Sequence, residues 1–548
     1  MTPRRIALAL AAGLALADSS IVTLALPELL ADFSTTVEGV AAVIGVYTVV
    51  LAATLIPAER LMRTFGPRSV GAGGFALFAG ASLACGLAGS LPALLTFRGV
   101  QAVGGAAGLV AAFALLTGKG HDGLSARSLW LGVAVLSAAI GPALGGALTQ
   151  LFSWQAIFFA QVPLAGLAVI AAGGAPEPKP APDTRPEGRS WIAGIALALV
   201  SAALTAVLFL LVLLLVAGWG VEPLRAAVAV TVLPLAALAG SRIGGPARIR
   251  AATGCLLVGG GTIALAFLPD ANLGWTIAPQ VVAGLGMGLA LPALGGELLP
   301  ERDAADAAWL LTMRHAGIAV ALVLLAPITA DRLDAATERA RERGVALVLD
   351  AQLPPTDKLS LAPDLLSGVE AEQPRAGLMD ALDAQADRYD AGTEERAVLE
   401  RLGVRADDTL VAAVGESFLA AFLITGALAI LGGLLLLPGA RRPGWAAVAI
   451  AVGGAAIAFT AVERARVAPE KVAIQDPCEE RALPDSEGLT GFLQDRALQQ
   501  IDKSACKIGA TREEYVLALA DPAAADAFQE RYGVDPRSTQ GILDALLG

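Results

Sequence analysis

Residues 131–159 read LGVAVLSAAIGPALGGALTQLFSWQAIFF, which predicts two apolar helices joined by a short turn. The first helix is interrupted by four residues: Gly141, Pro142, Gly145 and Gly146. Proline lacks the backbone N–H that a helix interior requires and should bend the helix. The glycines remove side-chain bulk, so a neighbouring helix can approach closely. This combination is typical of a membrane helix that rocks against a neighbour; the alternative is a rigid packing face of small residues.

The composition of the whole chain favours a membrane protein. Hydrophobic residues make up 55% of the 548 residues, charged residues 16%, and the mean hydropathy is +0.66. Apolar runs of about 20 residues, the length that spans a bilayer, recur along the chain. We predict thirteen spans, at residues 5–28, 37–57, 70–89, 92–117, 129–150, 155–173, 191–217, 222–240, 251–268, 274–298, 305–329, 415–438 and 444–462.

These spans predict an all-α membrane protein with a twelve-helix core of two six-helix bundles. A Pro-rich, charged stretch separates the two halves and is expected to be a linker. A thirteenth helix and small helical segments outside the membrane complete the fold. The predicted limits are 1–173 for the first bundle, 174–190 for a cytoplasmic linker, 191–330 for the next five helices, 331–414 for an insert, 415–438 for the twelfth helix, 444–462 for the thirteenth and 463–548 for a C-terminal domain.

Lysine and arginine gather in every second short loop, which sets the orientation in the membrane. The pattern predicts a multi-pass membrane protein with the N-terminus in the cytoplasm. The insert and the C-terminal domain then lie outside. Cys478 and Cys506 fall in that C-terminal domain, where an oxidising compartment would allow them to form a disulfide.

The insert and the C-terminal domain are acidic. Residues 331–414 carry 18 acidic and 10 basic side chains, a net charge of −8, and residues 463–548 carry 16 and 10, a net charge of −6. Neither is basic, so nucleic-acid binding is not expected. Apolar residues recur in both at helical spacing, which predicts helices packed on each other or on the membrane body. A solvated spacer is the alternative.

Charged residues inside spans are expensive and therefore point to function. The first span contains Asp18, the fourth contains Arg98 with Gln101 one turn later, and the eleventh contains Arg314 and His315. A carboxylate could gain and lose a proton as its surroundings change, whereas arginine stays charged and needs a counter-charge. Asp18 and Arg98 therefore suggest a central pathway, with a fixed ion pair as the alternative. His315 could relay protons or act as a neutral hydrogen-bonding residue.

The sequence does not indicate an enzyme. It contains no phosphate loop of the GxxxxGK type and no clustered His/Cys set for a metal. We expect no catalytic residues, no metal site and no cofactor.

Several stretches resemble motifs of the major facilitator superfamily, and within it the drug:proton antiporters usually built with fourteen spans. ADSSIVTLALP resembles the first-helix pattern LDxTIVNVALP, GPALGG the antiporter motif GPxxGG, and WQAIFFAQVPLAG the pattern WRWIFxINVPxG. Arg98 and Gln101 match the fourth-helix motif LxxxRxxQGxgaA. The matching stretches are residues 17–27, 94–106, 141–146, 154–166, 222–234 and 314–317.

Two departures from this family are evident. Its cytoplasmic loop motif GxLaDrxGrk is present as ERLMRTFGPR, in which Glu59 replaces the first Gly and Arg63 replaces the Asp, while Gly66 and Arg68 are kept. Glu59 and Arg63 are four residues apart and could pair. The extra pair of spans between the halves is missing.

The resemblance implies a secondary active transporter of a bacterial cytoplasmic (inner) membrane. It would carry out proton-coupled efflux of an amphiphilic small molecule by alternating access. Asp18 is the candidate for proton coupling, and Arg98, Gln101, Arg314 and His315 for the pathway. The glycines and Pro142 would form the bending contact. Expected partners are the lipid bilayer, the substrate and protons, with a possible extracytoplasmic partner through 331–414 and 463–548. The alternatives are a transporter of a lipid or envelope precursor, and a non-transporting receptor or scaffold.

Overall fold

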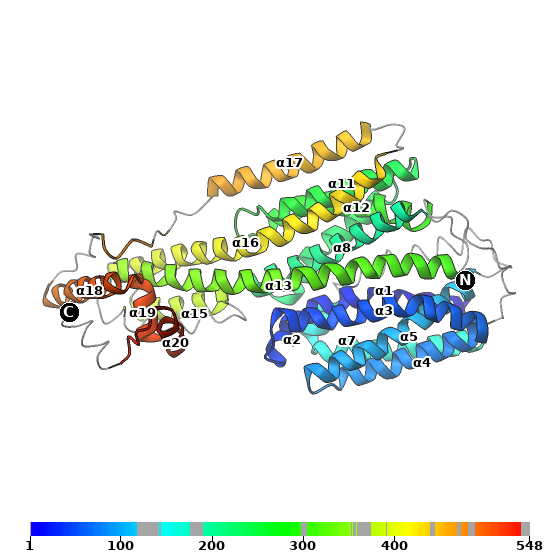
Figure 1. Ribbon diagram of the computed structural model, residues 1–548, viewed down its shortest axis with the longest axis horizontal. Helices are drawn as coiled ribbons and strands as arrows, with labels where there is room; N and C mark the ends of the chain where they lie inside the picture. Colours follow the sequence, from blue (N-terminus) through cyan, green and yellow to red (C-terminus); the bar gives the residue numbers. More distant parts are fainter. Residues whose placement is uncertain are drawn as a thin grey trace. The chain divides into compact units, whose positions relative to one another are not determined.

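A computed structural model gives the arrangement of the chain in space. It describes residues 2–117, 141, 144–175, 190–297, 304–351, 353, 358, 374–390, 392–438, 444–467, 472, 474–479 and 488–538. The described residues form helices and turns, with no strand among them (Figure 1). The predicted all-α class is therefore confirmed.

The chain divides into two compact units. The first, which we call the membrane unit, comprises Met1–Val216, Val221–Ala330 and Phe418–Arg466. The second, which we call the polar unit, comprises Ala217–Gly220, Asp331–Ser417 and Val467–Gly548.

The first half of the membrane unit is built from long apolar helices: α1 (Pro3–Val22), α2 (Leu26–Asp32), α3 (Val37–Phe65), α4 (Pro67–Gly86), α5 (Leu91–Thr117) and α7 (Trp154–Gly173). A 3₁₀ turn, η1 (Thr23–Ala25), links α1 to α2. Pro27 follows at the start of α2, where its missing N–H is tolerated. The first predicted span is therefore one helical segment with a break near its end.

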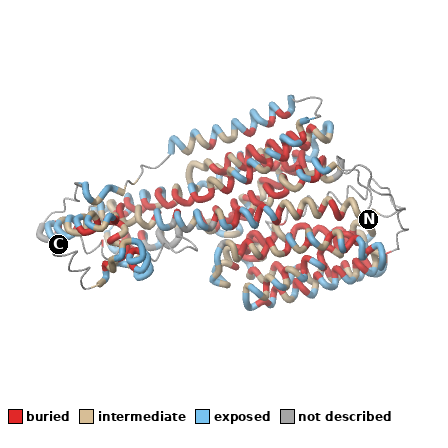
Figure 2. The backbone as a smooth tube through the Cα atoms, viewed as in Figure 1, coloured by how far each residue is buried: buried red, intermediate tan, exposed pale blue. Residues whose placement is uncertain are grey.

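The second half contains α8 (Trp191–Leu213), α9 (Pro223–Val230), α10 (Val232–Gly240), α11 (Ala247–Leu265), α12 (Gly274–Pro292), α13 (Ala304–Asp350), α16 (Glu394–Leu436) and α17 (Gly444–Val467). π-helical turns, η2 (Leu214–Gly218) and η3 (Ala293–Glu297), extend α8 and α12. Figure 2 shows that α17 is exposed along most of its length, as expected for a helix that faces lipid.

Eleven helices of the described part are long and apolar enough to cross a membrane, and they coincide with eleven of the thirteen predicted spans. The predicted span 251–268 is the helix α11, whose mean hydropathy is lowered by Arg248 and Arg250 at its start. The span 129–150 lies mostly outside the described residues, as does Pro142.

Close helix contacts at glycine hold each half of the membrane unit together. A Cβ atom at Gly104 of α5 would lie 2.5 Å from the backbone nitrogen of Phe78 in α4. A Cβ atom at Gly254 of α11 would lie 2.5 Å from the carbonyl oxygen of Gly286 in α12. These distances allow no side chain, so the glycines set the helix spacing, as is usual in membranes.

Two helices extend past the predicted ends of their spans. The eleventh span was expected to end at 329, but α13 continues to Asp350; α16 begins at Glu394, well before the twelfth span. The reason is local: residues 329–343, TADRLDAATERARER, contain neither Gly nor Pro and are rich in helix-forming Ala, Arg and Glu. The placement of the domain limits themselves stays a prediction.

The polar unit contains α15 (Pro374–Ala386), α18 (Gly488–Ile508), α19 (Arg512–Ala520) and α20 (Pro522–Tyr532). The last three lie in the predicted C-terminal domain, and a small core that includes Tyr515 and Phe528 joins them. The predicted disulfide between Cys478 and Cys506 is present. Insert and C-terminal residues thus share one folded unit, which favours their packing on each other over a solvated spacer.

One charged contact joins the insert to the C-terminal domain within this unit. Arg512 at the start of α19 is fully buried, and its Nη2 donates to Asp350 at the end of α13 at 2.7 Å. Asp502 of α18 lies 3.8 Å from its Nε. A buried guanidinium needs such carboxylates, because an unpaired charge in a protein interior is expensive.

Candidate functional site

The charged residues of the first and fourth spans form a buried ion pair. Arg98 of α5 donates from Nη1 to Oδ2 of Asp18 in α1 at 2.5 Å. Both side chains are 0% exposed. The Arg98 guanidinium also donates from Nε to the Val43 carbonyl oxygen of α3 at 3.0 Å, and it lies 4.4 Å from the centroid of the Tyr47 ring. Three helices of the first half therefore meet at this one cation.

Uncharged polar side chains complete the network around the pair. Gln101 accepts from Arg98 at 2.7 Å, and its Nε2 donates to Gln161 Oε1 of α7 at 2.7 Å and to Ser82 Oγ of α4 at 2.8 Å. Gln161 in turn donates from Nε2 to Asp18 Oδ1 at 2.8 Å. Both carboxylate oxygens of Asp18 thus have a donor, and we call this set the buried polar network.

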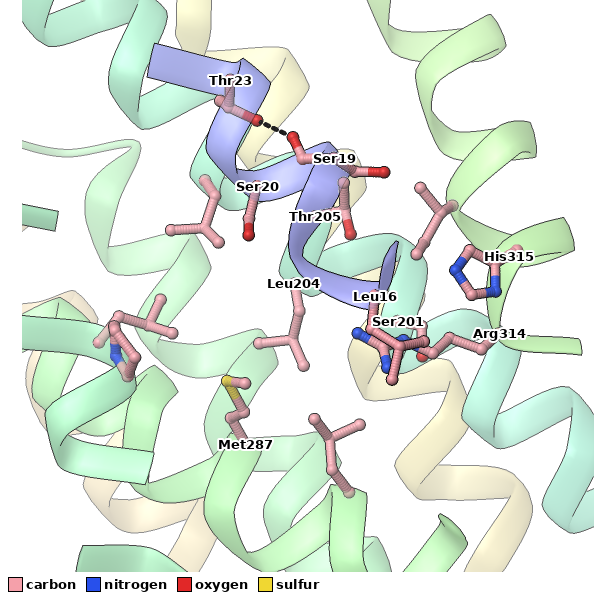
Figure 3. A pocket seen from close by; sticks show the side chains of 15 residues that line it. Leu16, Ser19, Ser20, Thr23, Ser201, Leu204, Thr205, Met287, Arg314 and His315 are labelled. Carbon is pink, nitrogen blue, oxygen red and sulfur yellow. Dashed lines mark hydrogen bonds between the residues drawn. The ribbon is translucent and has the colours of Figure 1, made fainter. Parts of the chain in front are cut away.

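A separate pocket lies between the two halves of the membrane unit (Figure 3). Its walls come from α1 and η1 in the first half and from α8, α10, α12 and α13 in the second. Its volume is about 60 Å³. Because one water needs about 10–15 Å³ on this measure, the pocket has room for a few waters. Drug-sized ligands occupy about 300–1,000 Å³, so a cargo of that size requires the halves to separate.

The helix α1 carries the pocket and the network on different faces. Leu16, Ser19, Ser20 and Thr23 line the pocket, and their spacing of three and four residues places them on one side of the helix. Asp18 is two positions from both Leu16 and Ser20, so it points into the first half instead. A movement of α1 would therefore act on both.

Arg314 and His315 of α13 line the pocket, and Figure 3 shows their side chains extending toward it. His315 is 2% exposed, and its Nδ1 lies 2.8 Å from the Leu311 carbonyl oxygen. Because a carbonyl oxygen only accepts, Nδ1 carries a hydrogen. Arg314 has no ion-pair or hydrogen-bond partner within the described ranges, in contrast to Arg98.

The glycines of the fifth predicted span lie against α1 and α9. A Cβ atom at Gly141 would lie 2.1 Å from Ser20 Oγ, and one at Gly145 would lie 2.1 Å from the Ile21 carbonyl oxygen. At Gly146 it would lie 2.5 Å from Cβ of Ala227, which belongs to α9 of the second half. These glycines thus permit contact within the first half and between the halves.

The altered loop motif forms a local cluster. Glu59 and Arg63 of α3 form the ion pair that their spacing suggests. Gly66 joins α3 to α4 with a φ of 80°, a left-handed conformation that favours glycine. Arg68 donates from Nη2 to the carbonyl oxygen of Gly173, the last residue of α7, at 2.7 Å.

The sequence identified only some of the residues that form the buried polar network and the pocket. It singled out Asp18, Arg98, Gln101, Arg314 and His315, and the structure brings the first three together while placing the other two in the pocket. It did not assign a role to Gln161, Ser82 or Tyr47, nor to the hydroxyl groups of the pocket wall. Gln161 carried a usable signal, since it is an amide within the apolar run FFAQVPL.

The described ranges contain no group of three or more His, Cys, Asp or Glu side chains placed to hold a metal ion. The sequence profile of the Major Facilitator Superfamily matches residues 8–330, more than half of the chain. The chain belongs to the major facilitator superfamily.

Curated members of the superfamily are similar to parts of this chain. The tetracenomycin C resistance and export protein of Streptomyces glaucescens is 37% identical over 173 residues, 31% of this chain and 32% of that protein. The multidrug resistance protein Stp of Mycobacterium tuberculosis is 32% identical over 156 residues, 28% of this chain and 29% of that protein. The drug efflux pump JefA of the same species is 30% identical over 205 residues, 36% of this chain and 40% of that protein. Each match thus covers less than half of the relative.

A solved transporter structure has a similar fold. A bacterial homologue of the human lysosomal transporter Spinster, inward-facing and unoccupied, aligns with a TM-score of 0.53 and 16% identity. The alignment covers 81% of this chain and 100% of that one. The likeness of fold therefore extends over most of this chain.

Proposed function

We propose that this chain is a secondary active transporter of a bacterial cytoplasmic membrane, which exports an amphiphilic small molecule by alternating access and is driven by protons. The observation that carries the proposal is the pocket lined by α1 from one half and by α8, α10, α12 and α13 from the other. When two helical halves rock against each other, a site between them opens first to one side of the membrane and then to the other. The export and resistance functions named for the relatives support the same reading.

Alternating access requires a contact that can open, and Gly146 supports one. Its lack of a side chain lets the fifth predicted span approach Ala227 of α9 across the boundary of the halves. Because the pocket of about 60 Å³ is too small for a drug-sized cargo, loading must widen it. Two helices that touch through small residues can separate easily, because no large side chains interdigitate between them.

Proton coupling is assigned to Asp18. Its carboxylate balances the charge of Arg98 inside the first half, so protonation would remove that balance and weaken the pair. The same helix presents Ser19 and Ser20 to the pocket. A change in the buried polar network would therefore shift the pocket wall through α1.

The proposed orientation places the N-terminus in the cytoplasm and the polar unit outside. The disulfide between Cys478 and Cys506 supports it, because disulfides persist in oxidising compartments. There the unit could meet an extracytoplasmic partner. Alkaline phosphatase fused after Gly548 should be active in intact cells, and the same enzyme inserted in the linker 174–190 should be inactive. The reverse pattern contradicts the orientation.

Transport in inverted membrane vesicles tests the main proposal. With a proton gradient imposed, wild-type protein should accumulate at least one of a set of amphiphilic dyes of different charge. Asp18→Asn leaves Arg98 unpaired and can fail to fold, so Asp18→Asn/Arg98→Gln is measured beside it, with the exposed Asp331→Asn as the control. The double variant should lose the response to the gradient, and the control should keep it. Dye movement by neither wild type nor control counts against the proposal.

A further inference from the structure

The charge of the pocket is not balanced within its described walls. Arg314 is the permanent cation of the lining, and no carboxylate is among the residues that line the pocket with it. The Asp18 carboxylate accepts hydrogen bonds from Arg98 and Gln161 in the buried polar network, on the other side of α1. An unpaired cation within a membrane is expensive to keep, which points to a functional counter-charge.

His315 does not supply that counter-charge. Its Nδ1 donates to the Leu311 carbonyl oxygen, so the ring is either neutral or positive, never negative. The wall therefore offers positive charge whichever form the ring takes.

The remaining wall combines hydrogen-bond donors with apolar surface. Ser201 is 3% exposed, and its Oγ is buried without a hydrogen-bond partner, although it lines the pocket. Thr205 and Ser19 add hydroxyl groups, while Leu204 and Met287 supply apolar contacts. A guanidinium with nearby hydroxyl groups matches an oxyanion, since charge-assisted bonds to a carboxylate are short and directional.

We propose that the pocket takes an acidic amphiphile, whose carboxylate or similar oxyanion pairs with Arg314 while its apolar body lies against the leucines and Met287. This inference rests on the proposed function, because it names the charge class of the cargo at the same pocket. It makes Arg314 the residue that selects the cargo and leaves Asp18 to the driving force.

Equilibrium binding separates the inference from the transport proposal. The probes are a dansyl-labelled undecanoic acid and its methyl ester, which differ in one negative charge. Their fluorescence is followed with purified full-length protein in lipid nanodiscs, after subtraction of empty nanodiscs. A hydrogen bond to a charged group predicts that the wild type binds the acid at least about tenfold more tightly than the ester.

The variants identify the residue responsible. Arg314→Gln should bind acid and ester alike, and Arg314→Lys should keep part of the preference. Arg225→Gln, which changes an exposed arginine paired with Glu222, should behave as the wild type. Equal affinity of the wild type for both probes, binding of neither, or an unchanged preference in Arg314→Gln overturns the inference.

The two proposals fail in different ways. If the wild type prefers the acid in nanodiscs but moves no dye in vesicles, the inference stands and the transport proposal fails. If dyes are moved but the Arg314→Gln variant keeps the acid preference, transport stands and the inference fails.

Discussion

Asp18 Oδ2 and Arg98 Nη1 are 2.5 Å apart although the two residues are separated by 80 positions in the chain, and both side chains are fully buried. The contact ties α1 to α5 within one half of the membrane unit. Because the pair lies on the face of α1 that points away from the pocket, its charge is hidden from a bound cargo in this conformation. The pair thus links the stability of the first half to the proton step proposed for it.

Breaking this pair on one side should destabilise the protein more than removing it entirely. Asp18→Asn leaves a buried guanidinium without its counter-charge, which costs about 3–5 kcal/mol of unfolding free energy. Asp18→Asn/Arg98→Gln removes both charges and should recover most of that loss. Thermal unfolding of the purified protein in detergent checks the order. An Asp18→Asn variant as stable as the wild type would show that the pair does not hold α1 and α5 together.

Gly145 should not tolerate even one added methyl group. Its Cβ would lie 2.1 Å from the backbone carbonyl oxygen of Ile21, which cannot move without shifting α1. Gly145→Ala should therefore lower stability by about 1–3 kcal/mol, the usual effect of overpacking. Gly166→Ala in α7 is the matched control, because it has no atom within 4 Å of the added Cβ and gains helix propensity of up to about 1 kcal/mol. Equal unfolding temperatures for the two variants would contradict the close contact.

The spans and the charged residues within them could be predicted from the sequence. Which of these residues join the buried polar network and which line the pocket could not. Asp18, Arg98 and Arg314 could be found because charges are rare in spans. Their directions could not be found, since a membrane helix is apolar toward lipid as well as toward its neighbours, and its periodicity is weak. Gln161 could have been found from its place in the apolar run FFAQVPL, whereas Ser82 could not, because single hydroxyl residues are too common in spans to stand out.

Helix ends were also predictable only where the chain marks them. The helix α20 begins at Pro522, because proline is tolerated in the first turn, where its missing N–H is not needed. Between Thr329 and Arg343, no Gly or Pro stops the helix, so the expected end of the eleventh span was not where α13 ends. Hydropathy reports where a membrane ends, whereas the helix ends where local propensity and capping decide.

Glu514 should stabilise the C-terminal helices in a pH-dependent way. Burial raises the pKa of its carboxyl, but hydrogen bonds from Thr511 and Tyr532 and the charge of Arg531 outweigh burial and lower the pKa below the ordinary 4.5. The ionised form is thus favoured by folding, so its contribution is present above pH 4.5 and is lost as the pH falls through the lowered pKa.

Glu514→Gln should therefore weaken the capping box of α19 by about 1 kcal/mol near neutral pH, and its difference from the wild type should shrink in acid. Hydrogen exchange of the amides of α19 and α20, measured on the intact protein with both forms at each pH, checks this. The exposed Glu530→Gln is the control. A difference that stays constant down to about pH 3 would contradict ionisation of Glu514 as its cause.

Arg512 should be the most sensitive basic residue of the polar unit. It is fully buried beside Asp350, Asp502 and the equally buried Glu513, so Arg512→Met removes the cation that these three carboxylates share. The expected loss is about 3–5 kcal/mol, seen as faster cleavage of the C-terminal domain by a protease. Arg512→Met/Glu513→Gln should recover part of it, whereas Arg537→Met, on an exposed side chain, should have no effect. Equal cleavage of the Arg512→Met and Arg537→Met variants would mean that the buried cluster does not hold α13 and α18 to α19.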